Sequence, residues 1–446
     1  MFAIRGGGGG CHDGGVSDAS PGAVTTAPPV RDRVLDAVRV SALGVVVLGH
    51  ALAWDVSTGT PGSVADRVPS LVWLTWVVQV LPLFFAVGAL ANLGSYRRHP
   101  DVAVFARRRL LRLGAPALVY ATLWTAVLLP LAAVTPLAVL AGDVLGILTW
   151  FLGVYAVAVV ATPWTSRWAG ARPVLTLFVW FAAIVAVDAV RFTVTPVVGW
   201  LNLLLVWGWL HQLGFHLPAL RRWSRRRLGA LAGAAFVAAV LLAGPGPYAW
   251  PLVTFEMDVE LSNFTPPTAV LALYGLAQVC VLALLYPWFD RALARERVWR
   301  VVSPAAARAI GLYLWHIPCV ALVGATAWLA GWDPPPVEPA WVGLHLLGVA
   351  VILPLTWVCA GVAARADRAV AVWLLTRRAR AVPTAPFVVA VPVALLVMTA
   401  TGFATWWGDV FLGVPWSSVL SLGMLVGALG GLAVSRTHGG PAGTRL

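Results

Sequence analysis

Long apolar runs, separated by short arginine-rich segments, recur along the whole chain. A run of about 18 or more apolar residues is long enough to cross a bilayer as a helix. Twelve candidate helices are centred near residues 44, 82, 123, 153, 181, 207, 236, 278, 315, 351, 394 and 422. The seventh, Leu228–Gly244, is short, and the third contains Pro116 and Pro130. The pattern therefore predicts an all-α, polytopic membrane helix bundle of about 10–12 transmembrane helices.

The apolar pattern also divides the chain. Residues 1–30 are rich in Gly, Ser, Pro and Thr and lack an apolar core, so we expect a disordered cytoplasmic tail and not a signal peptide. We expect a membrane-embedded core over residues 31–384, two additional transmembrane helices over residues 385–435, and a cytoplasmic C-terminal tail over residues 436–446.

Composition and charge agree with a membrane protein and give it an orientation. Sixty per cent of the residues are hydrophobic, mean hydropathy is +0.85, and all 31 basic residues are arginine. If the N-terminus is cytoplasmic, only Arg67 and Arg191 fall on the outer side. Arginine concentrates in cytoplasmic loops, so both termini are predicted to be cytoplasmic, in the cell membrane. The net charge of +13 then lines one membrane face and does not indicate a nucleic-acid partner.

The four cysteines, Cys11, Cys280, Cys319 and Cys359, show no paired spacing. We therefore predict neither a disulfide framework nor a metal site.

The first apolar run carries charged and titratable residues along one stripe. Arg39 and His50 are eleven residues apart, about three helical turns, so on a helix they share one face and lie ~16 Å apart along the axis. Asp36 lies near the same line and is spaced to pair with Arg39. Such residues are costly to bury in a membrane and usually serve a function. We predict a catalytic group of His50, Arg39 and Asp36, with neutral His50 as a general base.

A basic cluster begins the third run. Guanidinium groups bind phosphate bidentately, so Arg108, Arg109 and Arg112 are candidate ligands for a phosphorylated molecule such as coenzyme A. The alternative is that the cluster only anchors the topology or contacts anionic lipid.

A second histidine, His316, lies in the middle of the ninth run, three residues after Tyr313. These two residues form a candidate second site. The alternative is that His316 is an ordinary interhelical hydrogen-bond partner.

These segments together resemble the acyltransferase 3 family of multi-pass membrane enzymes. The stripe from Arg33 to His50 is similar to the family's first helix, in which an arginine, ten residues and a histidine form the signature. Four further segments match in order: Pro82-LFFAVGALAN, Arg109-Leu-Leu-Arg112, Thr149-Trp-Phe-Leu152 and Leu312-YLWHIP. The resemblance covers most of residues 31–330. It departs where the usual Ser-Gly of the second helix is Gly88-Ala89, and the last two helices carry no matching motif.

The resemblance implies transfer of an acyl group, usually acetyl, from cytoplasmic acyl-CoA to a hydroxyl of a glycan, lipid-linked sugar or small molecule. Carried over, His50 is the catalytic base, Arg39 its signature partner, and Arg109 and Arg112 contact the donor. Whether His50 activates the acceptor or itself accepts the acyl group stays open. The alternative functions are a secondary transporter and a lipid or polyprenol-glycan flippase. Against them, the two halves of the chain are not similar, and helix seven has no counterpart of the first-helix charges.

Overall fold

A computed structural model describes residues 32–55, 62–253, 263–378, 380, 382–406, 409–411 and 414–436. From Arg33 onward the chain forms one compact unit. The predicted tails, residues 1–30 and nearly all of residues 436–446, lie outside the described residues.

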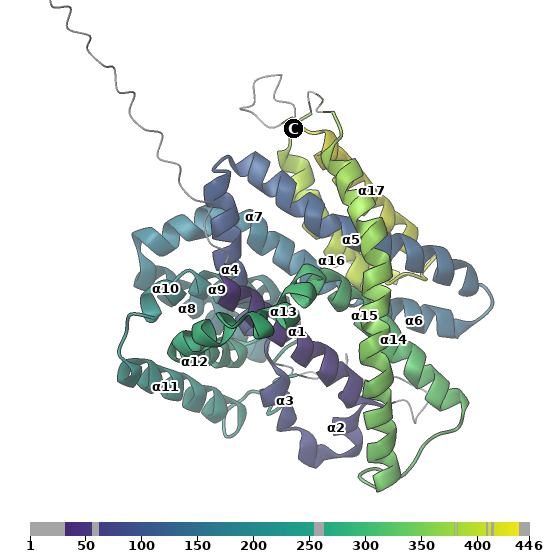
Figure 1. The fold of residues 1–446 in the computed structure, drawn as a ribbon, viewed down its shortest axis with the longest axis horizontal. Coiled ribbons are helices and arrows are strands. Elements are labelled where there is room, and N and C mark those ends of the chain that lie inside the picture. Colours follow the sequence, from purple (N-terminus) through teal and green to yellow (C-terminus); the bar gives the residue numbers. More distant parts are fainter. Residues whose placement is uncertain are drawn as a thin grey trace, which may run out of the picture. The chain divides into compact units, whose positions relative to one another are not determined.

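The described chain is built of helices, with two short antiparallel strand pairs, β1 with β2 and β3 with β4 (Figure 1). In chain order the elements are α1 (Arg33–Ala53), β1 (Trp54–Asp55), β2 (Gly62–Ser63), α2 (Val64–Arg67), η1 (Pro69–Leu71), α3 (Leu74–Val78), α4 (Leu81–Arg98), α5 (Val102–Leu131), α6 (Pro136–Gly146), α7 (Thr149–Ala171), α8 (Pro173–Thr193), η2 (Pro196–Leu201), α9 (Asn202–Gly214), α10 (Leu217–Leu220), α11 (Arg225–Ala243), α12 (Ala269–Leu293), α13 (Glu296–Ala307), α14 (Ala309–Leu329), α15 (Pro339–Leu375), α16 (Ala385–Thr401), β3 (Asp409–Phe411), β4 (Val414–Trp416) and α17 (Ser418–Val434).

The predicted membrane helix bundle is confirmed. Within the described residues, nine helical stretches are long and apolar enough to cross a membrane, and α16 and α17 are shorter apolar helices of 17 residues each. Every predicted centre falls inside a helix. The sixth is the least regular: α9 has 13 residues and is preceded by the 3-10 segment η2. The bundle is helical because backbone groups in lipid must be hydrogen-bonded within their own segment.

Helix α4 lies at the centre of the packing that builds the site. It contacts α1, α7, α9 and α12, while α16 packs on α7 and α17 on α5 (Figure 1). The approach of α4 and α9 is close enough to require glycine: a Cβ on Gly214 would lie 1.9 Å from the carbonyl oxygen of Ala86. Small residues allow this kind of backbone contact between membrane helices.

Contacts between connections agree with up-and-down threading. Arg67, after α1, forms an ion pair with Asp333, between α14 and α15, with 2.8 Å between nitrogen and oxygen. Arg33, at the start of α1, donates to the Leu293 carbonyl at 3.0 Å and pairs with Glu296 at 3.6 Å. The start of α1 therefore meets the end of α12, and the segment after α1 meets the segment after α14, as the predicted alternation of spans requires.

The close approach of α4 and α9 at Gly214 leads to a prediction about stability. Gly214→Ala should lower the melting temperature of the detergent-solubilised protein by about several degrees, because the new methyl group forces α4 and α9 apart. Thermal unfolding followed by size-exclusion chromatography measures the change. The matched control is Gly233→Ala on α11, where a Cβ meets nothing within 4 Å and helix propensity favours alanine. Equal melting temperatures for the two variants would contradict the packing described.

Candidate active site

Helix α1 carries the predicted stripe without a break from Arg33 to Ala53, so Arg39 and His50 lie on one helical face. The Arg39 side chain turns toward α7 and α4. It donates to the Tyr155 hydroxyl at 3.5 Å, and its guanidinium carbon lies 6.0 Å from the centre of the Phe84 ring. The expected ion pair between Arg39 and Asp36 is not formed among the described residues, because Arg39 reaches across to a neighbouring helix.

His50 meets His316 from α14. The centres of the two rings are 5.0 Å apart and the ring planes are inclined by 64°. In both residues Nδ1 donates to a backbone carbonyl of its own helix: His50 to Val46 at 2.7 Å, and His316 to Tyr313. A carbonyl only accepts, so each Nδ1 carries a proton, and in the neutral imidazole Nε2 is the nitrogen that holds the lone pair. His316 is fully buried, and its Nε2 has no hydrogen-bond partner in the described part of the chain.

Tyr313 holds this part of α14 against the start of α7. Its hydroxyl donates to the Leu148 carbonyl at 2.8 Å, and its ring lies 4.9 Å from the ring of Phe151. Three segments that are distant in the sequence, those around residues 50, 150 and 315, therefore meet in one place. Tyr313 contributes a packing face and an anchoring hydrogen bond to the histidine pair.

The predicted arginine cluster lines a small cavity of about 90 Å³ at the turn between α4 and α5. Its lining residues are Ser95, Arg98, His99, Phe105, Arg108, Arg109 and Arg112. The structure thus brings together all three arginines predicted to bind a phosphorylated ligand. The volume suits a few waters or one phosphate-sized group, since a liquid water occupies about 30 Å³.

Three further lining residues were not predicted, because nothing in their local sequence pattern distinguishes a lining residue from an ordinary loop residue: Ser95, Arg98 and His99. Arg108 donates to His99 Nε2 at 2.9 Å. Partial burial, together with the positive charges of Arg108, Arg98 and Arg112, lowers the pKa of His99 below its ordinary value. His99 is therefore neutral at pH 7.

Arg107, the first arginine of the cluster, has a different role. It donates to the carbonyls of Leu432 at 3.0 Å and Ala433 at 2.6 Å, in the last turn of α17. Carbonyls at a helix C-terminus lack partners within the helix and favour a cation there. Arg107 thus ties the last helix to α5 and does not face the cavity.

A buried polar network, also missed from sequence, continues inward from the cavity. Arg109 donates to Asn92 Oδ1, the Tyr155 hydroxyl donates to the same oxygen at 3.4 Å, and Asn92 Nδ2 lies 3.2 Å from His211 Nε2. Asn92 is fully buried and His211 nearly so. The available signal was an asparagine in the middle of an apolar span, which needs a partner on another helix.

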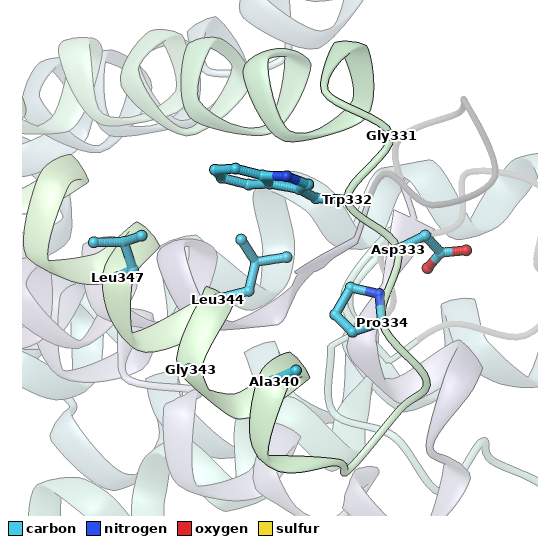
Figure 2. A pocket seen from close by; sticks show the side chains of 8 residues that line it. All are labelled: Gly331, Trp332, Asp333, Pro334, Ala340, Gly343, Leu344 and Leu347. Carbon is cyan, nitrogen blue, oxygen red and sulfur yellow. The ribbon is translucent and has the colours of Figure 1, made fainter.

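A larger cavity, about 500 Å³, lies between the end of α14 and the start of α15 (Figure 2). Trp332, Leu344 and Leu347 point into it, whereas Asp333 points away and is paired with Arg67. Asp333 is the single titratable residue among those that line the cavity, and its ion pair with Arg67 makes it a poor general base for acyl transfer.

Comparison with known proteins identifies one family. The acyltransferase 3 family model, described as an acyltransferase domain, matches residues 32–363. No curated protein and no solved structure matches the chain. The described residues contain no group of three or more His, Cys, Asp or Glu side chains placed to hold a metal ion.

The position of His99 predicts that anion binding in the arginine cavity depends on pH. A bound anion favours the protonated imidazole and so raises the lowered pKa of His99. Anion binding should therefore strengthen as pH falls from 7.5 to 5.5, by about tenfold for each unit by which the anion raises the pKa. Sulfate keeps its charge over this range, and its stabilisation of the purified protein can be read from melting temperature at each pH. In His99→Gln the pH dependence should be lost; the same dependence in both proteins would remove His99 from the site.

Proposed function

The chain belongs to the acyltransferase 3 family and is a membrane acyltransferase, and we propose that it moves an acyl group, acetyl in the first instance, from cytoplasmic acyl-CoA to the hydroxyl of an acceptor. The acceptor classes we propose are a glycan, a lipid-linked sugar or a small molecule. The single observation that carries the proposal is the pair His50 and His316, two imidazoles in contact inside the bundle, each with its Nδ1 held by a backbone carbonyl.

The donor is held by its phosphates in the arginine cavity. Arg108, Arg109 and Arg112 supply guanidinium donors that suit phosphate oxygens. Arg39 then lies between this cavity and the histidine pair, on the same helix as His50. The rise of a helix places His50 ~16 Å from Arg39, so the extended pantetheine arm of the donor spans the distance that separates phosphate binding from the reaction.

At the histidine pair, two routes to the product are open. In the first, His50 Nε2 takes the proton of the acceptor hydroxyl, whose oxygen attacks the thioester carbonyl; the C–S bond breaks, and the CoA thiolate takes the proton. In the second, His50 Nε2 attacks the thioester carbonyl, and the C–S bond breaks to release CoA as the thiolate. The acceptor oxygen then attacks the acyl carbon, the bond between the acyl carbon and Nε2 breaks, and the hydroxyl proton goes to the thiolate. His316, with its unpartnered Nε2, is close enough to share the proton in either route.

The reaction is proposed to cross the cell membrane. Arginine distribution favours a cytoplasmic position for both termini and for the arginine cavity, and with this orientation His50 lies toward the outer half of α1. The alternative functions, a secondary transporter or a flippase, receive no support from the family match, which covers residues 32–363. Incubation of the purified protein with acetyl-CoA separates the classes, because a transporter has no reason to release free CoA thiol.

His50→Ala should reduce acetyl transfer by about 100-fold or more, because it removes the general base or nucleophile. Transfer of labelled acetyl groups from acetyl-CoA into membranes that contain each variant measures the effect. His345→Ala is the matched control: His345 also lies in a membrane helix and donates its Nδ1 to the carbonyl one turn earlier, Trp341, at 2.9 Å. Full transfer by a correctly inserted His50→Ala protein would overturn the assignment.

Arg109→Ala should raise the apparent KM for acetyl-CoA by about tenfold or more, since a charged hydrogen bond to the donor is lost. The control is Arg97→Ala, which removes an exposed arginine of the same cytoplasmic turn that does not line the cavity. If KM is the same in both variants, the cluster serves only to anchor the topology.

A further inference from the structure

Five helices contribute one polar side chain each to the network around Asn92. Arg39 comes from α1, Asn92 from α4, Arg109 from α5, Tyr155 from α7 and His211 from α9. Asn92 Oδ1 accepts from Arg109 and from the Tyr155 hydroxyl, and the same hydroxyl accepts from Arg39. Two guanidinium groups are therefore organised by one carboxamide, Arg109 directly and Arg39 through Tyr155.

The orientation of this carboxamide is determined by its neighbours. A guanidinium only donates, so the Asn92 oxygen faces Arg109. The amide nitrogen then faces His211 Nε2, which accepts because Asn92 Nδ2 carries only donors. His211 thereby prevents the amide from turning over and presenting its NH₂ group to the two arginines.

The charges in this network are not balanced. Within the described part of the chain, neither Arg39 nor Arg109 has a carboxylate partner, and the buried Nε of Arg39 has no hydrogen-bond acceptor. Two guanidinium groups near each other repel, and burial makes this costly. An aspartate at position 92 has nearly the same shape as asparagine and would neutralise one of the charges, yet the chain has the uncharged amide.

We propose that Asn92 is a positioning residue that holds Arg39 and Arg109 as a paired guanidinium site without a counter-ion, so that a phosphate group of the acyl donor supplies the missing negative charge. The inference rests on the proposed function for the identity of the donor. It extends the donor site inward from the arginine cavity, which Arg109 also lines, to Arg39 on the helix that carries His50.

The decisive variant is Asn92→Asp, because stability and binding should change in opposite directions. The carboxylate relieves the repulsion between Arg39 and Arg109, and His211 can donate to it from Nε2 in its other tautomer, so the melting temperature should stay the same or rise. It also occupies the place of the donor's charge, so the Kd for acetyl-CoA should increase by about tenfold or more. A residue that merely filled space would not raise Kd in a protein of unchanged or higher stability.

Three further variants test whether the positions of Arg39 and Arg109 depend on this network: Asn92→Leu, Tyr155→Phe and Gly88→Ala. Asn92→Leu keeps both positive charges but removes their acceptor, so it should lower both stability and kcat/KM. Tyr155→Phe removes the link to Arg39 and should reduce kcat more than it changes Kd. In Gly88→Ala the new Cβ would lie 3.3 Å from the Tyr155 hydroxyl and 3.0 Å from its ring, so it should resemble Tyr155→Phe. Gly94→Ala, whose Cβ has only Arg98 within 4 Å, at 3.8 Å, is the control on the same helix.

The measurements use full-length protein in nanodiscs, with Kd for acetyl-CoA from calorimetry, melting temperature, and steady-state kcat and KM. Wild-type protein that does not bind acetyl-CoA would overturn the proposed function. Wild-type binding with an unchanged Kd in Asn92→Asp would overturn the inference alone. Nanodiscs with and without phosphatidylglycerol distinguish the source of the phosphate. If anionic lipid abolishes acetyl-CoA binding in the wild type but not in Asn92→Asp, a lipid headgroup occupies the site and the inference for the donor is overturned.

Discussion

The cost of holding charged and polar groups between apolar helices is the constraint on which the whole site depends. Lipid offers no hydrogen-bond partners to an arginine or asparagine side chain within the bilayer. Each such side chain therefore needs a hydrogen-bond partner on another helix. The result is a set of interhelical bonds that meet at α4, which contacts α1, α7, α9 and α12. These interhelical hydrogen bonds lower the cost of burial. They also determine which N–H groups of the arginines remain free to bind a ligand and which are already hydrogen-bonded to the protein.

This constraint agrees with the proposed separation of phosphate recognition and acyl chemistry at different depths. Guanidinium groups are tolerated near the turn between α4 and α5, where water and headgroups are within reach, and the last of them, Arg39, is supported by Tyr155. Neutral imidazoles are much cheaper to bury, so the pair His50 and His316 can lie deeper, where a thioester is shielded from hydrolysis. The proposed donor, acyl-CoA, is long and thin, with its phosphates at one end and its thioester at the other. It therefore matches an arrangement in which arginines lie near the turn and imidazoles lie deeper.

Local geometry could be predicted from the sequence, and side-chain partners mostly could not. The common face of Arg39 and His50 follows from helix periodicity alone, and all the predicted spans fall on helices because hydrophobic length is a local property. The contact of His50 with His316 joins residues 266 positions apart, so the local pattern of neither segment indicates it. Arg107 and Arg108 are neighbours of the same type, yet one caps α17 and the other lines the cavity; only the packing of the last helix separates them. Asn92 and His211 were passed over because a single polar residue in an apolar run does not indicate which helix it faces.

The hydrogen bonds of Arg107 show that the folded unit extends beyond the residues that match the family. The family match stops at residue 363, but Arg107, within that match, is satisfied by the carbonyls of Leu432 and Ala433. Residues of α16 and α17 belong to the same hydrophobic core as α5 and α7. A chain cut at the family boundary would leave a guanidinium without acceptors and an apolar surface on α5 and α7 without its cover. The last two helices, which carry no shared motif, therefore complete the same bundle that the family match covers only in part.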